Sequence, residues 1–173
     1  KLLSMQGFRG TICSVKEFEY LKRKINGRVP ENVRHAKAAR SDFEDKIEAL
    51  VHDLYWRDFE LLVDLIFRQA GWQRVSDLGK TLRALDLELV SPITAERYGV
   101  QVKSEAHLAE FEEYLNRFAH MQGYTRLYFV VHSPSRDLRG AEPPGDVELW
   151  FPEDIAHWVV NYGLAEWVIE KAS

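Results

Sequence analysis

After residue 56 the chain switches repeatedly between helical and alternating hydrophobic patterns, and this switching limits the folds open to it. One helical face carries four apolar residues at helical spacing: Phe59, Leu62, Val63 and Ile66. Gly71 marks the end of that helix. The segment WQRVSD then predicts a short strand, and LDLELV and YGVQVKS predict two more.

The rest of the chain returns to a helix and then to strands. A second amphipathic helix carries Leu108, Phe111, Leu115 and Phe118. The almost wholly apolar LYFVV suits a strand that is buried on both faces, and DVELW predicts a further strand. Pro152 opens the closing helices, which Gly163 interrupts. The order of helix, three strands, helix, one or two strands and closing helices predicts an α/β sandwich around a mixed sheet.

The first third of the chain has a different composition. The segment ENVRHAKAARSDFEDKIEALVHDLYW lacks Gly and Pro, and it predicts one long helix preceded by a shorter one across the turn NGRVP. A narrow apolar stripe follows the long helix: Phe43, Ile47, Leu50 and Leu54. Because such a stripe is typical of a coiled-coil seam, residues 1–56 are predicted to form a helical arm. The arm either closes a homodimer or folds back on its own domain, residues 57–173.

Composition excludes several classes of protein. With 46% hydrophobic residues, a chain of 173 can bury a core, and its single cysteine, Cys13, excludes a disulfide framework. Apolar runs such as FELLVDLIF are broken by charge before the roughly 20 residues of a membrane span. We therefore expect a soluble, cytoplasmic protein without a membrane partner. Since the formal net charge is -4, a nucleic acid would have to meet a local basic surface or a metal ion.

Two of the predicted strands carry an unusual set of polar residues. Successive strand residues point to opposite faces, so the leucines of LDLELV share one face and Asp86 lies on the other. In YGVQVKS the valines alternate with Gln101 and Lys103. If these strands pair as a hairpin, Asp86, Gln101 and Lys103 converge on one side.

This set of side chains suits metal-assisted hydrolysis of a phosphodiester. Carboxylate and amide oxygens are hard ligands for Mg²⁺, and a lysine can orient water and offset phosphate charge. The preceding helix presents Glu60 on the same stripe as Asp64, which offers a further oxygen. The simpler alternative is a solvated polar face, the usual condition of one side of an antiparallel sheet.

The order of these residues is similar to that of a known family. A helix with an early Glu ends in Gly-aromatic in DFELLVDLIFRQAGW, and the isolated acid of LDLEL and then QVK follow. Here the chain resembles the PD-(D/E)xK nuclease superfamily, and within it the Mrr-type restriction endonuclease-like domains, which often carry Gln in place of the acid of ExK. The resemblance covers about residues 57–132. Leu85 stands where the superfamily commonly has Pro.

The resemblance implies a fold, an activity and a set of roles. It implies a restriction endonuclease-like core and a Mg²⁺-dependent endonuclease that hydrolyses phosphodiester bonds in DNA, with Mn²⁺ as a substitute. Asp86 would be the principal metal-binding acid, Gln101 the second ligand and Glu60 an accessory acid. The carbonyl of Val102 would add a ligand, and Lys103 would position the attacking water.

Other hypotheses stay open beside the nuclease. Gln101 in place of an acid leaves the site one negative charge short, which favours a catalytically silent domain that binds nucleic acid or a protein partner. The chain could also be one part of a larger defence or repair assembly. Six cations flank the site on the chain and form either a basic rim around it or an ordinary solvated charged face: Arg57, Arg68, Arg74, Lys80, Arg83 and Arg97. The histidines lack ligand spacing and are expected to have surface or packing roles; only His132, at the end of the LYFVV strand, is a candidate for a place near a substrate.

Overall fold

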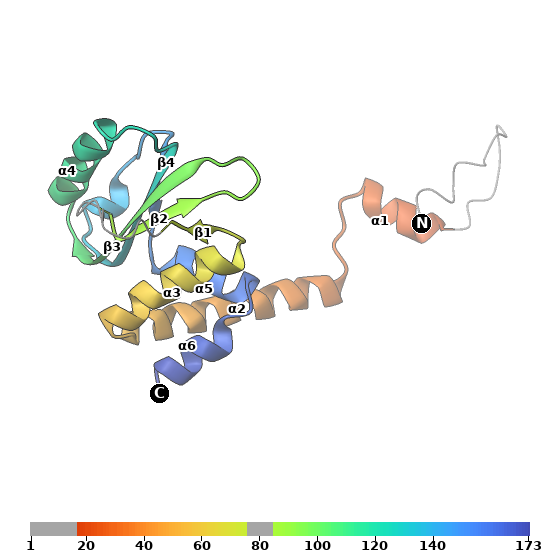
Figure 1. Cartoon of the computed structure of the whole chain (residues 1–173). Coiled ribbons are helices and arrows are strands. Elements are labelled where there is room, and N and C mark those ends of the chain that lie inside the picture. Colours follow the sequence, from red (N-terminus) through yellow and green to blue (C-terminus); the bar gives the residue numbers. More distant parts are fainter. Residues whose placement is uncertain (1–16, 76–84) are drawn as a thin grey trace, which may run out of the picture. The chain divides into compact units, whose positions relative to one another are not determined.

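The computed structural model describes residues 17–75 and 85–173, which divide between Ser41 and Asp42 into two compact units. The first unit contains α1 (Phe18–Ile25) and the beginning of α2 (Glu31–Asp53). The second contains the rest of α2 and all later elements (Figure 1). The predicted division into a helical arm, residues 1–56, and a domain, residues 57–173, stays a prediction.

The later elements follow the predicted order. The helices are α3 (Trp56–Gln69), α4 (Leu108–Ala119), α5 (Pro152–Asn161) and α6 (Ala165–Lys171), with the 3-10 turn η2 (Leu138–Gly140). The strands are β1 (Gln73–Arg74), β2 (Leu87–Val90), β3 (Arg97–Ala106), β4 (Arg126–Pro134) and β5 (Val147–Trp150). The α/β class predicted from the sequence is confirmed.

The sheet is mixed, with the strand order β1-β2-β3-β4-β5. β1 and β3 both pair antiparallel with β2, whereas β4 is parallel to β3 and β5 is parallel to β4. The parallel step from β3 to β4 needs a crossover, which α4 provides. The hairpin of β2 and β3 is the one on which the predicted site depends.

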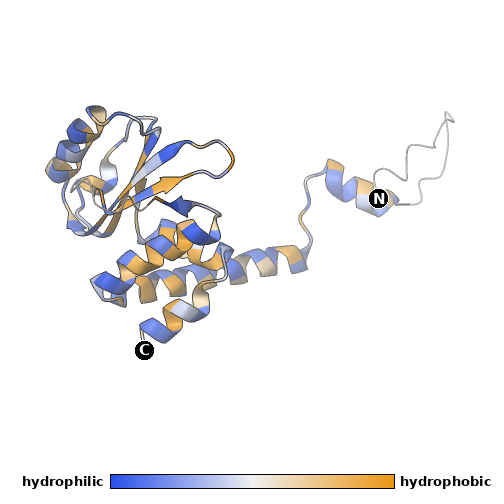
Figure 2. Ribbon diagram, in the orientation of Figure 1, coloured by the Kyte–Doolittle hydropathy of each residue, from blue (hydrophilic) through white to orange (hydrophobic). Residues whose placement is uncertain are grey.

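Two hydrophobic cores cover the two faces of the sheet. On one face the buried residues of α2, α3, α5 and α6 pack against β2, β3 and β4. On the other face Phe111 and Phe118 of α4 pack against Phe129 and Val131 of β4. In Figure 1 α4 accordingly lies across the sheet from α3 and α5, and the helices carry both hydrophobic and hydrophilic residues (Figure 2).

The predicted helix ends are also found. Gly71 follows α3 with φ of +87° and Gly163 separates α5 from α6 with φ of +71°, a backbone conformation that residues with a Cβ rarely adopt. Pro152 is the first residue of α5, where its missing N–H costs no helical hydrogen bond.

The apolar stripe of α2 is divided between core and surface. Ile47 and Leu54 are 1% and 5% exposed and belong to the core that α3 and α5 complete, and Leu50 packs against it. Phe43 is 41% exposed. Val51 is buried beside them, so the apolar face is wider than a coiled-coil seam. This part of α2 thus folds back on its own unit, one of the two alternatives that the sequence left open, and most of the stripe is buried there.

No helix in the described parts of the chain has both the length and the apolar composition that crossing a membrane requires. Cys13, Lys80 and Arg83 lie outside the described residues.

Candidate active site

Asp86 lies immediately before β2 and extends the β2–β3 hairpin with its side chain. Its backbone N–H donates to the carbonyl of Val100 at 3.0 Å, and its Oδ2 accepts the N–H of Val102 at 2.7 Å. Because β2 begins at Leu87, opposite Val100, no β2 backbone group faces Val102. The Asp86 carboxylate instead accepts the hydrogen bond that a β2 carbonyl would otherwise accept from Val102. The position of the carboxylate is therefore set by the backbone of β3.

Gln101 is 6% exposed and contacts Asp86 through its amide nitrogen. The Nε2 group donates to Asp86 Oδ2, and it lies 3.4 Å from the carbonyl oxygen of Val102. An amide beside a carboxylate turns its NH₂ group toward it, because only that end can donate. In this arrangement Gln101 stabilises the Asp86 carboxylate, and the amide oxygen predicted as a metal ligand is not the atom that meets Asp86.

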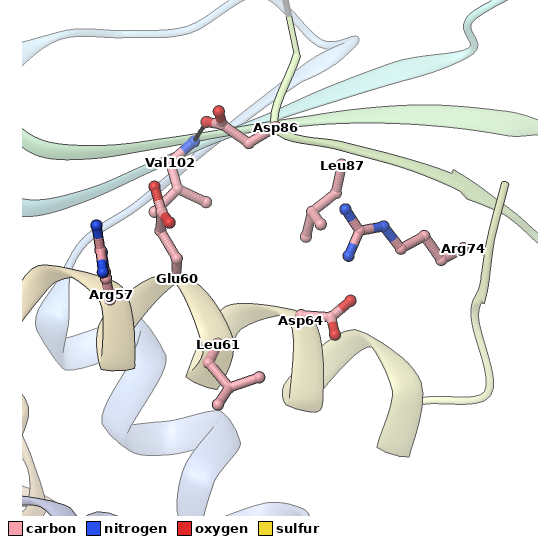
Figure 3. A pocket seen from close by; sticks show the side chains of 8 residues that line it. All are labelled: Arg57, Glu60, Leu61, Asp64, Arg74, Asp86, Leu87 and Val102. Carbon is pink, nitrogen blue, oxygen red and sulfur yellow. Dashed lines mark hydrogen bonds between the residues drawn. The ribbon is translucent and has the colours of Figure 1, made fainter. Parts of the chain in front are cut away.

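Glu60 reaches the same place from α3. A pocket of about 300 Å³ is lined by Glu60, Asp86 and Val102, together with Arg57 and Arg74. Figure 3 shows Glu60 pointing from α3 toward Asp86, with the arginines at either side. Burial and then the Asp86 charge raise the pKa of Glu60, while Arg57 opposes the shift. Two carboxylates thus share one partly enclosed space.

A third acid, Asp64, lines the pocket one helical turn further along α3. It is 4% exposed; its Oδ2 pairs with Arg68 at 2.7 Å, and its buried Oδ1 has no hydrogen-bond partner among the residues described. Within residues 17–75 and 85–173, no three His, Cys, Asp or Glu side chains converge to hold a metal ion. Any cation here would depend on two carboxylates and on backbone, amide or water oxygens.

Lys103 lies beside this pocket but has partners of its own on α4. Its Nζ is 2.9 Å from Glu110 Oε1 and 4.8 Å from the centre of the Tyr114 ring. Burial alone would lower the pKa of the ammonium, but the contacts with Glu110 and Tyr114 leave it raised. A hollow of about 350 Å³ is lined by Lys103, Glu60 and Val102, so the lysine still borders the site.

His132 has a structural role in this arrangement. Its Nε2–H donates to the carbonyl of Val51 at 2.9 Å, which leaves Nδ1 to accept from Ser133 Oγ at 2.9 Å. Its ring packs edge-on against Phe59 with 4.9 Å between centroids. Both ring nitrogens are therefore engaged, which agrees with the packing role that the sequence favoured over a place near a substrate.

The predicted basic rim is brought together only in part. Arg57 and Arg74 line the pocket, whereas Arg68 is paired with Asp64. The partners of Lys103 were not predicted from the sequence. Glu110 and Tyr114 are four residues apart on one helix and so share a face, but which strand that face meets depends on tertiary packing.

Comparison with known proteins finds no family model, no curated protein and no solved structure that matches this chain.

Proposed function

We propose that the protein is a metal-dependent nuclease with a restriction endonuclease-like fold, hydrolysing phosphodiester bonds in DNA. The observation that carries the proposal is the meeting of Glu60, Asp86 and Val102 around one pocket, with Lys103 beside it. These are four of the residues that the resemblance to PD-(D/E)xK nucleases implies, and they come from α3, β3 and the residue just before β2.

The donor set fits Mg²⁺, with Mn²⁺ as a substitute. Glu60, Asp86 and the Val102 carbonyl offer hard oxygens, and Mg²⁺ commonly binds through one or two carboxylates while keeping several waters. Burial and then the charge of Asp86 raise the pKa of Glu60, and a cation between the two carboxylates would favour their charged forms. When bound, the ion would polarise the phosphate and lower the pKa of a coordinated water.

The chain's own residues would orient these groups and supply positive charge. The Val102 N–H and the Gln101 amide hold Oδ2 of Asp86, which fixes the direction of the carboxylate. The raised pKa of Lys103 keeps its ammonium charged at neutral pH, so its contribution would be to offset phosphate charge and orient water. A lysine with this pKa is poorly suited to act as a general base.

A second candidate is a catalytically silent domain of the same fold that binds nucleic acid or a protein partner. The ion pair between Lys103 and Glu110 supports it, because a lysine held by a carboxylate on α4 is not presented to a phosphate. Gln101 adds to this support, since its neutral amide replaces an acid.

The test is cleavage of supercoiled plasmid and single-stranded DNA with Mg²⁺ or Mn²⁺ and with EDTA. Asp86→Asn and Glu60→Gln should each reduce cleavage by about 100-fold or more, because ligand loss removes several kcal/mol of transition-state stabilisation. Asp45→Asn, an exposed acid of α2, is the matched control and should retain full activity.

The result also separates the two candidates. A folded natural chain that cuts neither DNA with either metal would support the silent domain. Cleavage that persists in Asp86→Asn would show that this pocket is not the active site.

A further inference from the structure

The two units carry opposite net charges. Residues 1–41 contain 10 lysines and arginines against 3 aspartates and glutamates, whereas residues 42–173 contain 13 against 24. The unit with the candidate active site is therefore strongly acidic, and it repels a polyanion over distances of about a Debye length, ~8 Å at physiological salt. Attraction for a polyanion has to come from elsewhere in the chain.

A pocket in the first unit gathers positive charge. It measures about 460 Å³ and is bordered by Tyr20, Arg23, Lys24, Arg28 and Lys37, which we call the basic pocket. The cations come from α1, from the turn after it and from α2. All four are exposed, so each can reach a ligand without any change in packing.

The four cations are held together without acidic partners. No salt bridge joins Arg23, Lys24, Arg28 or Lys37 to an acid of the described chain, and Glu31 instead lies 3.8 Å from His35. Arg23 and Lys24 lie over the Tyr20 ring, at 5.6 and 5.8 Å from its centre. Four like charges around one pocket repel one another, and an anionic ligand would remove that repulsion.

We infer that the basic pocket binds the phosphate backbone of a nucleic acid and delivers it to the acidic unit. The inference deepens the proposed function and rests on it for the identity of the polyanion. Cations interleaved with an aromatic ring are the usual surface for nucleic acid, since the cations neutralise phosphates while the ring stacks on a base. The acidic unit would then supply the chemistry and the basic unit most of the affinity.

The test measures binding of the full chain to a short fluorescent DNA duplex and single strand in EDTA, where cleavage does not occur. The variant R23Q/K24Q/R28Q should raise the Kd at least tenfold. Its plot of log Kd against log salt should flatten by roughly 2–3 units, about 0.9 for each duplex phosphate that the variant no longer neutralises. Glutamine keeps the helix propensity of the residues that it replaces.

Two further variants make the test specific. K46Q/R117Q/R136Q removes the same charges from exposed positions of the acidic unit and should leave the Kd and the salt slope nearly unchanged. R28Q/K37Q lies outside α1 and should weaken binding in the same direction, even if the triple variant perturbs that helix. Equal effects of the basic-pocket and control variants on the Kd would overturn the inference, because bulk charge would then explain binding.

The remaining outcomes separate this inference from its alternatives. Tighter binding to phosphatidylcholine–phosphatidylserine vesicles than to DNA would overturn it in favour of a membrane surface. If the natural chain cuts no DNA but its binding in EDTA depends on the basic pocket, the nuclease proposal fails and this inference stands. If the chain cuts DNA while R23Q/K24Q/R28Q binds DNA as tightly as the natural chain, this inference fails and the nuclease proposal stands.

Discussion

At the scale of single residues, Asp86 is part of the hairpin as well as of the candidate site. Asp86→Ala would leave the N–H of Val102 and the amide of Gln101 buried without their acceptor, which costs about 1–3 kcal/mol. Asp86→Asn keeps a carbonyl oxygen for Val102 and should lose less. Urea unfolding of the two variants checks this, and equal stabilities would contradict the structural role of the carboxylate.

Lys103 gives a second prediction at this scale. Glu110→Gln removes the carboxylate that holds the ammonium and helps to raise its pKa, so the pKa of Lys103 should fall. If Lys103 serves the proposed nuclease, the freed side chain should increase the cleavage rate at neutral pH. The measurements are lysine titration by NMR and plasmid cleavage, with Glu113→Gln, which changes an acid paired with Arg117, as the control. An unchanged pKa in Glu110→Gln would contradict the ion pair.

His132 predicts a dependence of stability on pH. Burial lowers the pKa of His132 below its ordinary value of 6.5, with His52 adding to the shift and the hydrogen bond to Val51 opposing it. As the pH falls below 6.5, the unfolded chain takes up the proton before the folded chain does, so the free energy of unfolding falls. His132→Gln, which can still donate to Val51, should lose less stability between pH 7.5 and pH 5. Parallel curves for both proteins would contradict the prediction.

Strand alternation was enough to predict that Asp86 and Gln101 lie together, because a hairpin sets its cross-strand partners by register. It was not enough for Lys103. The same alternation points Lys103 toward α4, and only the packing of that helix brings Glu110 within reach. The role of Gln101 also depends on whether its amide oxygen or its amide nitrogen faces Asp86, and a residue pattern does not distinguish the two.

At the scale of elements, period and glycine placement predicted the helices from α3 onward and their ends. Within the described residues, Gln73 and Arg74 pair with β2, and the N–H of Val75 donates to the carbonyl of Glu88 at 2.9 Å. The last two residues of the predicted strand WQRVSD lie outside the described residues. The apolar stripe of α2 did not show whether the helix forms a dimer seam or packs on its own domain. Over a few turns, a seam and one side of a buried face have the same residue spacing. Val51 distinguishes the two, because it widens the apolar face beyond a seam and packs in the core.

The burial of α2 leads to a prediction about two residues one turn apart on its apolar stripe. Ile47→Ala should reduce the free energy of unfolding of the second unit by about 2–5 kcal/mol, because it leaves a cavity beneath α3 and α5. Phe43→Ala, one turn earlier and 41% exposed, should cost less than about 1 kcal/mol. Chemical denaturation followed by tryptophan fluorescence measures both. A small effect of Ile47→Ala would place the helix outside the core.

At the scale of the whole molecule, the net charge of -4 is the sum of a basic unit and an acidic one. The net charge of the whole chain therefore conceals the separation of basic and acidic segments, which is the feature that matters most for a polyanionic substrate. The information was present in the sequence, and it becomes visible once the chain is divided, as it is at residue 41.

The first unit should also differ from the second in its dynamics. None of the residues 17–41 is buried, so the amides of α1 should exchange with solvent far faster than those of β3 and β4. Hydrogen exchange measured by mass spectrometry checks this, and DNA should slow exchange in residues 17–41 if the basic pocket binds it. Protection of α1 equal to that of β4 would contradict the prediction.

In the described residues, the sheet ends at each side in a short strand, two residues in β1 and four in β5. A long, flat edge strand has a row of unpaired backbone groups on which strands of other molecules can add, and aggregates grow in this way. Short edge strands present few such groups. The chain should therefore stay dispersed at the concentrations that binding experiments require. If it assembles with other copies or with other proteins, it should do so by packing side chains, and disassembly should then respond to salt and dilution rather than require denaturant.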